Sequence, residues 1–331
     1  MALKVRWGLL STARINRRLI TAIRASQRGE LVAVASREAE KARAYAAEWE
    51  IPLAFGSYEA LLASDEVDAV YISLPNHLHA EWSIRAMKSG KHVLCEKPLA
   101  LSVGEVDGMI AASRETGRVL AEAFMYRHHP QTKIAGEWVQ RGRLGEILLV
   151  RSVFNFALTS RPNIRLVPEY GGGCLWDVGV YPVSFAQFIL GGAPQWVCGS
   201  QWLGESGVDE AFAGLLHYSG NRAAQIACSF RSPFYTCAEV IGSEGRLFLT
   251  KPFTRLEEDR HLIFYPPQGE PTEIPVPEQE LYLGEVEDMH AAILDGASCY
   301  LTLEESREHV RTAVALYESA RSQQVVYLQA D

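Results

Sequence analysis

The chain has 331 residues, of which 48% are hydrophobic and 22% charged, and its formal net charge at pH 7 is −8. This composition is typical of a globular protein with a sizeable core, and the length suits about two domains of ~150 residues each. The negative charge argues against a general nucleic-acid binder, which needs a basic surface for phosphates.

Residues 1–124 alternate strand-like and helix-like stretches. The predicted strands are 4–10, 30–36, 54–56, 67–75, 91–98 and 118–125, and the predicted helices are 15–26, 38–50, 57–64, 76–90 and 101–117. Local signals support these helices, with Ser57 and Asn76 as N-caps and a capping box at Ser102 and Glu105. Alternation of this length predicts βαβ units and a parallel sheet, whose ligands bind at the carboxyl ends of the strands.

The first strand ends at Ser11, Thr12 and Ala13, where a dinucleotide-binding fold has its glycine-rich turn. Such a site needs close approach of the backbone to the pyrophosphate and a helix N-terminus directed at the phosphates. These small residues permit that approach, and the two hydroxyls can bond phosphate. On the motif alone, an ordinary strand–helix turn that binds nothing is equally consistent.

Ser36 and Arg37 follow the second strand, where NAD sites usually have an acidic residue that bonds the ribose hydroxyls. A hydroxyl beside a guanidinium would hold a 2′-phosphate, and Lys41 would add a second positive charge. We therefore predict NADP(H) in preference to NAD(H). The alternative is that Arg37 is a solvated loop residue.

The second half of the chain contains strand-like runs separated by Gly, Ser and Pro turns, followed by two helical stretches. The predicted strands are 146–158, 195–204, 211–219, 222–232, 237–250, 262–267 and 325–328, and the predicted helices are 283–296 and 303–322. Gly242 to Gly245 is a natural hairpin turn, and Thr302 with Glu305 forms a second capping box.

No segment reaches the ~18 apolar residues needed to cross a membrane, and the N-terminus lacks a signal-peptide pattern. The six cysteines include no Cys-x-x-Cys pair. We therefore expect reduced thiols in the core, a cytoplasmic protein and no membrane partner. The histidines at 77, 79, 128 and 129 lack further ligands, so no metal is expected.

Five motifs resemble the glucose–fructose oxidoreductase/inositol dehydrogenase/MocA family, especially its dimeric dihydrodiol dehydrogenase and NADP-dependent D-xylose dehydrogenase branch. These are WGLLSTARI (7–15), PNHLH (75–79), CEKPLA (95–100), EAFMYRHHP (122–130) and GGGCLWDVGVYPV (171–183). The resemblance implies an α/β fold with an N-terminal Rossmann domain (1–124). It also implies a C-terminal α+β domain (125–331) with a large, mostly antiparallel open sheet, for substrate binding and for assembly as a homodimer or homotetramer. All three glycines of the family's turn are replaced here, and the C-terminal segment is expected to pack back on the first domain.

Reduction of a carbonyl by a nicotinamide needs a proton source and positive charge near the carbonyl oxygen. Lys97 ends a strand before Pro98, which favours an extended backbone at Lys97, and the resemblance implies a cis peptide there. Asp177 and Tyr181 would share one face of a helix, although Pro182 makes a straight helix through Tyr181 uncertain. The resemblance implies Tyr181 as the acid–base group, Lys97 as the group that stabilises its phenolate, and Asp177 as a group that orients a substrate hydroxyl. A surface lysine, a core tyrosine and a helix-capping aspartate are the structural alternatives.

The remaining site residues are predicted from the same strand ends and motifs. The cofactor-binding set is Ser11, Thr12, Ala13, Ile15, Ser36, Arg37, Lys41, Leu74, Pro75, Asn76, His79, Glu96 and Lys97. The substrate-binding set is Tyr126, Phe154, Asp177 and Tyr181. Phe156 also suits stacking on a sugar or ring diol, or a place in the core, and Arg161 and Arg165 are candidate substrate contacts.

These features predict an oxidoreductase that transfers a hydride between NADP(H) and a small molecule: a sugar, polyol, keto-sugar or cyclic trans-diol. A catalytically idle NADP(H)-binding regulator is the first alternative. A sugar–sugar transhydrogenase that holds its NADP is the second.

Overall fold

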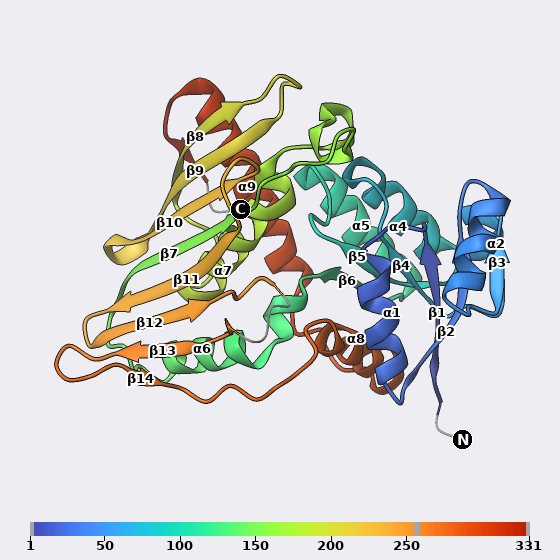
Figure 1. Cartoon of the computed structure of the whole chain (residues 1–331), viewed down its shortest axis with the longest axis horizontal. Coiled ribbons are helices and arrows are strands. Elements are labelled where there is room, and N and C mark those ends of the chain that lie inside the picture. Colours follow the sequence, from blue (N-terminus) through green and yellow to red (C-terminus); the bar gives the residue numbers. More distant parts are fainter. Residues whose placement is uncertain (1–2, 255–258, 329–331) are drawn as a thin grey trace. The chain divides into compact units, whose positions relative to one another are not determined.

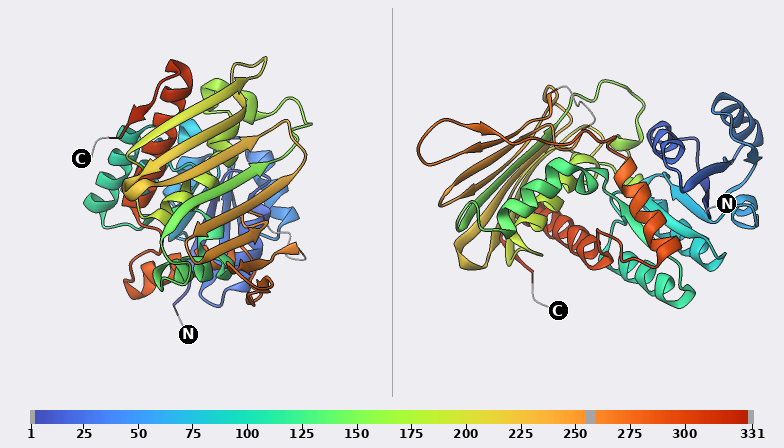
Figure 2. Two further views of the ribbon diagram at one scale, coloured as in Figure 1. Left: turned by 90° about the vertical axis from the view of Figure 1, so that its left-hand side faces the viewer. Right: turned by 90° about the horizontal axis from the view of Figure 1, so that it is seen from below.

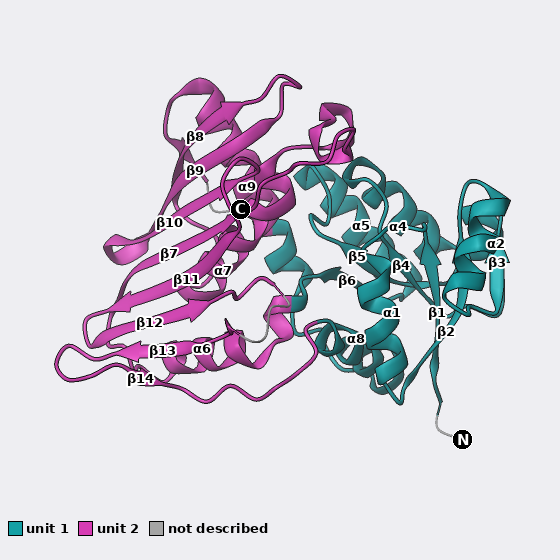
Figure 3. Cartoon of the chain, viewed as in Figure 1, with its two compact units in different colours: residues 1–125, 282–307 teal, residues 126–281, 308–331 magenta. Residues whose placement is uncertain are grey.

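The structure is a computed structural model that describes residues 3–254 and 259–328. It divides into two compact units (Figure 3). Unit 1 comprises 1–125 and 282–307, and unit 2 comprises 126–281 and 308–331. The division therefore falls within helix α9 (Leu303–Ser322).

Unit 1 is built on a six-stranded sheet in which every neighbouring pair is parallel (Figure 1). Its strands are β1 (Val5–Leu10), β2 (Gly29–Ala35), β3 (Leu53–Phe55), β4 (Ala69–Ile72), β5 (His92–Glu96) and β6 (Leu120–Ala123). Its helices are α1 (Asn16–Ala25), α2 (Ala39–Glu48), α3 (Tyr58–Leu62), α4 (His79–Lys88), α5 (Val103–Thr116), α8 (Leu283–Asp295) and the first part of α9. The strand order β3-β2-β1-β4-β5-β6 reverses between β1 and β4, which is where such sheets bind ligands.

The local helix signals in unit 1 are largely confirmed. The Ser57 hydroxyl accepts from the Ala60 N–H (3.1 Å), and Ser102 and Glu105 form their capping box. The prediction for Asn76 is wrong, because residues 76–78 form a 3₁₀ turn and α4 begins at His79. The turn leaves Asn76 outside the helix that it was expected to cap.

Helix α8 packs against α1 and β1 within unit 1. The indole Nε1–H of Trp7 donates to Nε2 of His290 (2.9 Å), and both side chains are completely buried. A segment far along the chain therefore completes the first unit.

Unit 2 is built on a nine-stranded sheet whose neighbouring strands are antiparallel except for the parallel pair β7 and β10. Its strands are β7 (Ile147–Asn155), β8 (Trp196–Leu203), β9 (Asp209–Tyr218), β10 (Arg222–Ser229), β11 (Tyr235–Gly242), β12 (Gly245–Thr250), β13 (Leu262–Tyr265), β14 (Thr272–Glu273) and β15 (Val326–Tyr327). Its helices are α6 (Pro130–Gln140), α7 (Val180–Leu190) and the last part of α9. The predicted fold class and the hairpin turn at Gly242 to Gly245 are confirmed.

One face of the nine-stranded sheet packs on α6, α7 and α9, whereas no described helix covers the other face (Figure 2, left). Burial alternates along the strands accordingly, with Leu216 and Thr236 buried and their neighbours Leu215 and Tyr235 exposed. The sheet is therefore open, as the resemblance implied.

The expectation that no segment is apolar enough to cross a membrane is wrong, because one described helical stretch, Pro168–Leu190, is long and apolar enough by length and composition. Its most apolar window is 89% buried inside the structure. This burial is what the core helix of a folded domain shows.

Candidate functional site

The turn after β1 has the positive backbone φ that glycine usually adopts, although the residue there is Ser11. Ser11 has φ of +125°, a conformation that L side chains rarely adopt. Its hydroxyl bonds the Ser73 hydroxyl (2.8 Å) and accepts from the Ala13 N–H (3.1 Å). Asn16 completes the network, since its amide donates to the Ser11 carbonyl and its oxygen accepts from Ser73. The Ser11 side chain thus stabilises the turn from inside and is buried.

Helix α1 starts directly after this turn. Its N-cap residue, Ile15, makes no side-chain cap hydrogen bond to any described residue, and the first turn carries no acidic residue. Thr12, Ala13 and Ile15 are all partly exposed. The N–H groups and positive dipole end of α1 therefore suit a phosphate.

The residues after β2 form a small polar group. Ser36 is buried and its hydroxyl accepts from the Glu38 N–H (3.4 Å), whereas Arg37 is exposed. Burial raises the pKa of Tyr58, and the charge and hydrogen bond of Arg37 oppose that rise, so Arg37 lies beside this hydroxyl. Lys41 bonds Glu38 (2.6 Å) at the surface. Part of the positive charge expected from Lys41 is thus matched by Glu38.

His79 connects the loops that follow β4 and β5. It is completely buried, with Nδ1 2.8 Å from the Pro98 carbonyl and Nε2 2.9 Å from the Leu74 carbonyl. Burial lowers the pKa of His79, which favours a neutral ring with a single N–H that bonds one of the two carbonyls. The ring therefore lies between the loops that follow β4 and β5 and is fixed by a hydrogen bond to one of them.

The loop after β5 carries Lys97, half-buried, followed by the cis peptide to Pro98 that the resemblance implied. The preceding Glu96 accepts a hydrogen bond from the hydroxyl of Tyr71 on β4. Glu122 on β6 accepts from the Leu99 N–H (2.9 Å). Carboxylates on both sides thus fix the backbone that presents the lysine.

In unit 2, Asp177 and Tyr181 do not lie on one straight α-helix. Residues Leu175–Gly179 form a π-helical turn, which we call the π turn, and α7 begins at Val180. Asp177 accepts from Nε of Arg165 (2.6 Å), so Arg165 from the preceding loop holds the carboxylate. The N-cap residues of the π turn and of α7 are Cys174 and Gly179, so Asp177 does not occupy a cap position.

Tyr181 lies in a cluster of rings. Its centroid is 5.7 Å from that of Tyr126, 5.4 Å from that of Phe154 and 5.6 Å from that of Phe253. The Tyr126 hydroxyl donates to Ser184 (2.8 Å), which leaves its ring as an apolar wall. The structure thus brings the predicted Tyr126, Phe154 and Tyr181 together, and adds Phe253, which lies in no recognisable motif.

Other predicted residues lie elsewhere in unit 2. Phe156 packs on Phe230, and Arg161 pairs with Glu210 (3.6 Å). The described residues include no group of three or more His, Cys, Asp or Glu side chains that could hold a metal ion. Instead, His129 caps α6, since its Nδ1 accepts from the Gln131 N–H (3.1 Å).

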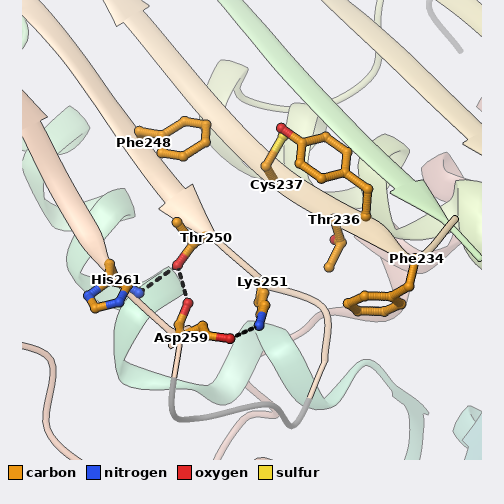
Figure 4. A pocket seen from close by; sticks show the side chains of 9 residues that line it. Phe234, Thr236, Cys237, Phe248, Thr250, Lys251, Asp259 and His261 are labelled. Carbon is orange, nitrogen blue, oxygen red and sulfur yellow. Dashed lines mark hydrogen bonds and ion pairs between the residues drawn. The ribbon is translucent and has the colours of Figure 1, made fainter.

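A separate cavity of about 280 Å³ lies at the end of β11 and β12 (Figure 4). Its lining residues are Phe234, Tyr235, Thr236, Cys237, Phe248, Thr250, Lys251, Asp259 and His261. None of these is a predicted site residue, and the cationic Lys251 is paired with Asp259.

Comparisons with known proteins agree with this geometry. A family described as an oxidoreductase family with an NAD-binding Rossmann fold matches residues 5–124, and the C-terminal domain of the same family matches 132–248. D-xylose 1-dehydrogenase (NADP(+)) 2 of Haloferax volcanii is 38% identical over 97% of this chain and 99% of its own length. Trans-1,2-dihydrobenzene-1,2-diol dehydrogenase of Danio rerio is 34% identical over 73% of each chain.

Among solved structures, a 3-ketoreductase from Actinomadura kijaniata in complex with NADP and TDP-benzene superposes with a TM-score of 0.89. It is 30% identical and covers 96% of this chain and 98% of its own. The chain therefore belongs to the oxidoreductase family of glucose–fructose oxidoreductase, inositol dehydrogenase and MocA, as the motifs at the strand ends predicted.

Proposed function

We propose that this oxidoreductase transfers a hydride between NADP(H) and a carbon bearing a hydroxyl or carbonyl group in a sugar, polyol, keto-sugar or cyclic trans-diol. The observation that carries the proposal is the set of strand ends in unit 1. Small, polar and cationic residues follow β1, β2, β4 and β5, on both sides of the point where the strand order reverses. The similarity to a xylose dehydrogenase and to a diol dehydrogenase supports this class of substrate.

The residues present fit NADP(H). The positive φ of Ser11 gives the turn the backbone of a glycine turn, and the N-terminus of α1 suits the pyrophosphate. Ser36 and Arg37 would hold the 2′-phosphate, and no carboxylate directly follows β2 to repel it. Pro75, Asn76 and the backbone held by His79 would line the nicotinamide end. The bound cofactor supplies or accepts the hydride.

The protein groups supply the proton and the positioning. We assign Tyr181 as the acid or base at the substrate oxygen and Lys97 as the cation that stabilises its phenolate and binds that oxygen. Asp177, held by Arg165, would orient a neighbouring substrate hydroxyl. The rings of Tyr126 and Phe154 would exclude water from this group.

The test is turnover of a panel of aldoses, polyols and trans-diols with NADP and NAD side by side. We expect NADP to be preferred. Lys97→Met and Tyr181→Phe should each lower kcat by about 100-fold or more while still binding nucleotide, because each removes a group of the proton transfer. Full activity in both variants would refute the site.

The same panel separates the alternatives. A regulator would bind NADP without turning over any substrate. A transhydrogenase would purify with NADP that does not exchange, visible as nucleotide absorbance in the fresh protein.

We also propose that the uncovered face of the nine-stranded sheet joins copies of this chain into a homodimer or homotetramer. Large apolar side chains stand on it, with Trp202 47%, Leu215 37% and Tyr235 52% exposed. Its charges are matched locally, because Glu239 pairs with both Arg151 and Arg246. A Leu215→Asp variant should sediment as a smaller species than the wild type. If the variant and the wild type sediment with the same mass, this interface is contradicted.

A reducing compartment such as the cytoplasm is our proposal for the setting of the protein. All six cysteines are free. Three are buried as expected, whereas Cys198 is exposed on the sheet. Thiol titration of the unfolded protein should count six, and a lower count without reductant would contradict the proposal.

A further inference from the structure

Unit 2 contains a buried carboxylate that contacts the turn carrying the proposed site residue Asp177. Asp209 is the first residue of β9 and is only 2% exposed. Burying a carboxylate is costly unless it is well hydrogen-bonded. Its neighbours therefore indicate what this residue does in the fold.

Three donors surround the carboxylate. Oδ2 accepts from the backbone N–H of Leu175 (2.8 Å) and from the thiol of Cys174 (3.1 Å). Oδ1 accepts from the hydroxyl of Tyr317 on α9 (2.7 Å). Leu175 is the first residue of the π turn, so a strand side chain caps the turn that carries Asp177.

The chain before the π turn is shaped around this carboxylate. Gly173 has φ of +121°, and a Cβ there would collide with Asp209 Oδ1. The Gly173 N–H donates to the Arg165 carbonyl (2.9 Å), and its carbonyl accepts from the Asp177 N–H (3.1 Å). Gly173 thus links the loop of Arg165 to the turn of Asp177 through its backbone hydrogen bonds. It does so where it packs directly against the Asp209 carboxylate.

The π turn determines how Asp177 is placed relative to Tyr181. A π-helical turn holds more residues than an α-helical turn, so relaxation to α-helix would rotate one side chain relative to the other. The hydrogen bond from the Leu175 N–H joins Asp209 to the backbone of the π turn, and the constraint on Asp177 passes through that backbone. Misplacement of a catalytic group by about 1 Å can cost ~100-fold in rate.

We infer that Asp209 is a positioning residue: by accepting from the Leu175 N–H it fixes the π turn and with it the arrangement of Asp177 and Tyr181. This inference rests on the proposed function of those two residues. Its essential element is the hydrogen bond to Leu175. The negative charge is not essential to it.

Three substitutions distinguish the effect of the hydrogen bond to Leu175 from the effect of the negative charge of Asp209 and from a general loss of stability. Asp209→Ala removes the acceptor. Asp209→Asn keeps an oxygen for Leu175 and turns an NH₂ towards the Tyr317 oxygen, which accepts. Tyr317→Phe removes only the donor on the opposite oxygen and keeps the ring that lies against Trp176.

We expect Asp209→Ala to lower kcat by about 100-fold with the NADP dissociation constant unchanged. Asp209→Asn and Tyr317→Phe should stay within about threefold of the wild type, because both keep the Leu175 hydrogen bond. A wild-type kcat in Asp209→Ala would overturn the inference. So would an equal loss in Asp209→Asn, which would point to the charge, or in Tyr317→Phe, which would point to stability alone.

Hydrogen exchange of the peptide 173–181 gives a readout without substrate. Exchange should accelerate in Asp209→Ala and not in Asp209→Asn, and equal exchange in both would refute the anchor. If the wild type turns over no sugar or diol, the proposed function fails while this measurement still decides the anchor. If Asp209→Ala does not fold, Asp209→Leu makes the same test, since it removes the acceptor for the Leu175 N–H and fills the space of the carboxylate.

Discussion

We propose that single side chains at the end of β2 determine which nucleotide the protein binds. Ser36 is buried at the strand end, Arg37 lies beside the hydroxyl of Tyr58, and Lys41 is paired with Glu38. Arg37 and Lys41 carry the same charge four residues apart and have different surroundings. They therefore form a matched pair for testing cofactor choice.

Arg37→Ala should weaken NADP binding by about 10- to 100-fold, because a charge-assisted hydrogen bond contributes about 1.5–3 kcal/mol. NAD lacks the 2′-phosphate, so its affinity should not change. Fluorescence titration with both nucleotides measures the ratio.

Lys41→Ala is the control for this substitution. Its side chain is 63% exposed and bonds Glu38, so its loss should change NADP affinity by about threefold or less. Equal effects of the two substitutions, or an equal loss of NAD affinity in Arg37→Ala, would contradict the assignment of the 2′-phosphate to Arg37.

The secondary-structure elements were predictable wherever the signal was local. The alternating strands of unit 1, its capping boxes and the hairpin at Gly242 all follow from residues within a few positions of one another. The π turn was not predictable, since its anchor Asp209 lies 34 residues beyond Leu175 in the sequence. The same holds for Phe253, which reaches the Tyr181 ring from a loop that carries no motif.

Two helical glycines show how packing between elements overrides helix propensity. Replacing an exposed helical glycine by alanine usually stabilises a protein, by about 0.5–1 kcal/mol. At Gly104 in α5 an added Cβ meets nothing within 4 Å. At Gly136 in α6 an added Cβ would collide with the ring of Phe188 on α7. The guanidinium of Arg127 lies over this ring.

Gly104→Ala should therefore raise the free energy of unfolding by about 0.5–1 kcal/mol. Gly136→Ala should lower it by about 1–3 kcal/mol, because the two helices must separate to admit the methyl group. Urea unfolding of both variants measures the two changes. If Gly136→Ala also stabilised the protein, the close packing of α6 on α7 would be wrong.

At the scale of the whole molecule, buried histidines couple folding to pH. Burial, with nearby cationic side chains as a smaller cause, lowers the pKa of His128 and of His129 to about 3. Both are almost fully buried, and His129 uses an unprotonated Nδ1 to cap α6. The folded protein therefore holds both rings neutral at a pH where the unfolded chain would protonate them.

The sign of the effect follows from proton binding. Between the unfolded pKa of about 6.5 and the folded value near 3, the unfolded chain binds more protons, so stability falls as pH falls. At pH 5 each ring should cost about 2 kcal/mol relative to pH 7. Buried Asp209, whose pKa burial raises, acts with the opposite sign, so the wild type alone cannot isolate the histidines.

A double variant, His128→Gln with His129→Asn, isolates these two histidines. The contributions of all other titrating groups are the same in both proteins and cancel when the variant is compared with the wild type. Asparagine retains a capping oxygen for α6, so the helix should persist. We expect the difference in unfolding free energy between pH 7 and pH 5, measured by urea titration, to be smaller in the variant by about 3–4 kcal/mol. The same difference in both proteins would mean that these histidines are protonated in the folded state, and the burial that separates them from water would then be wrong.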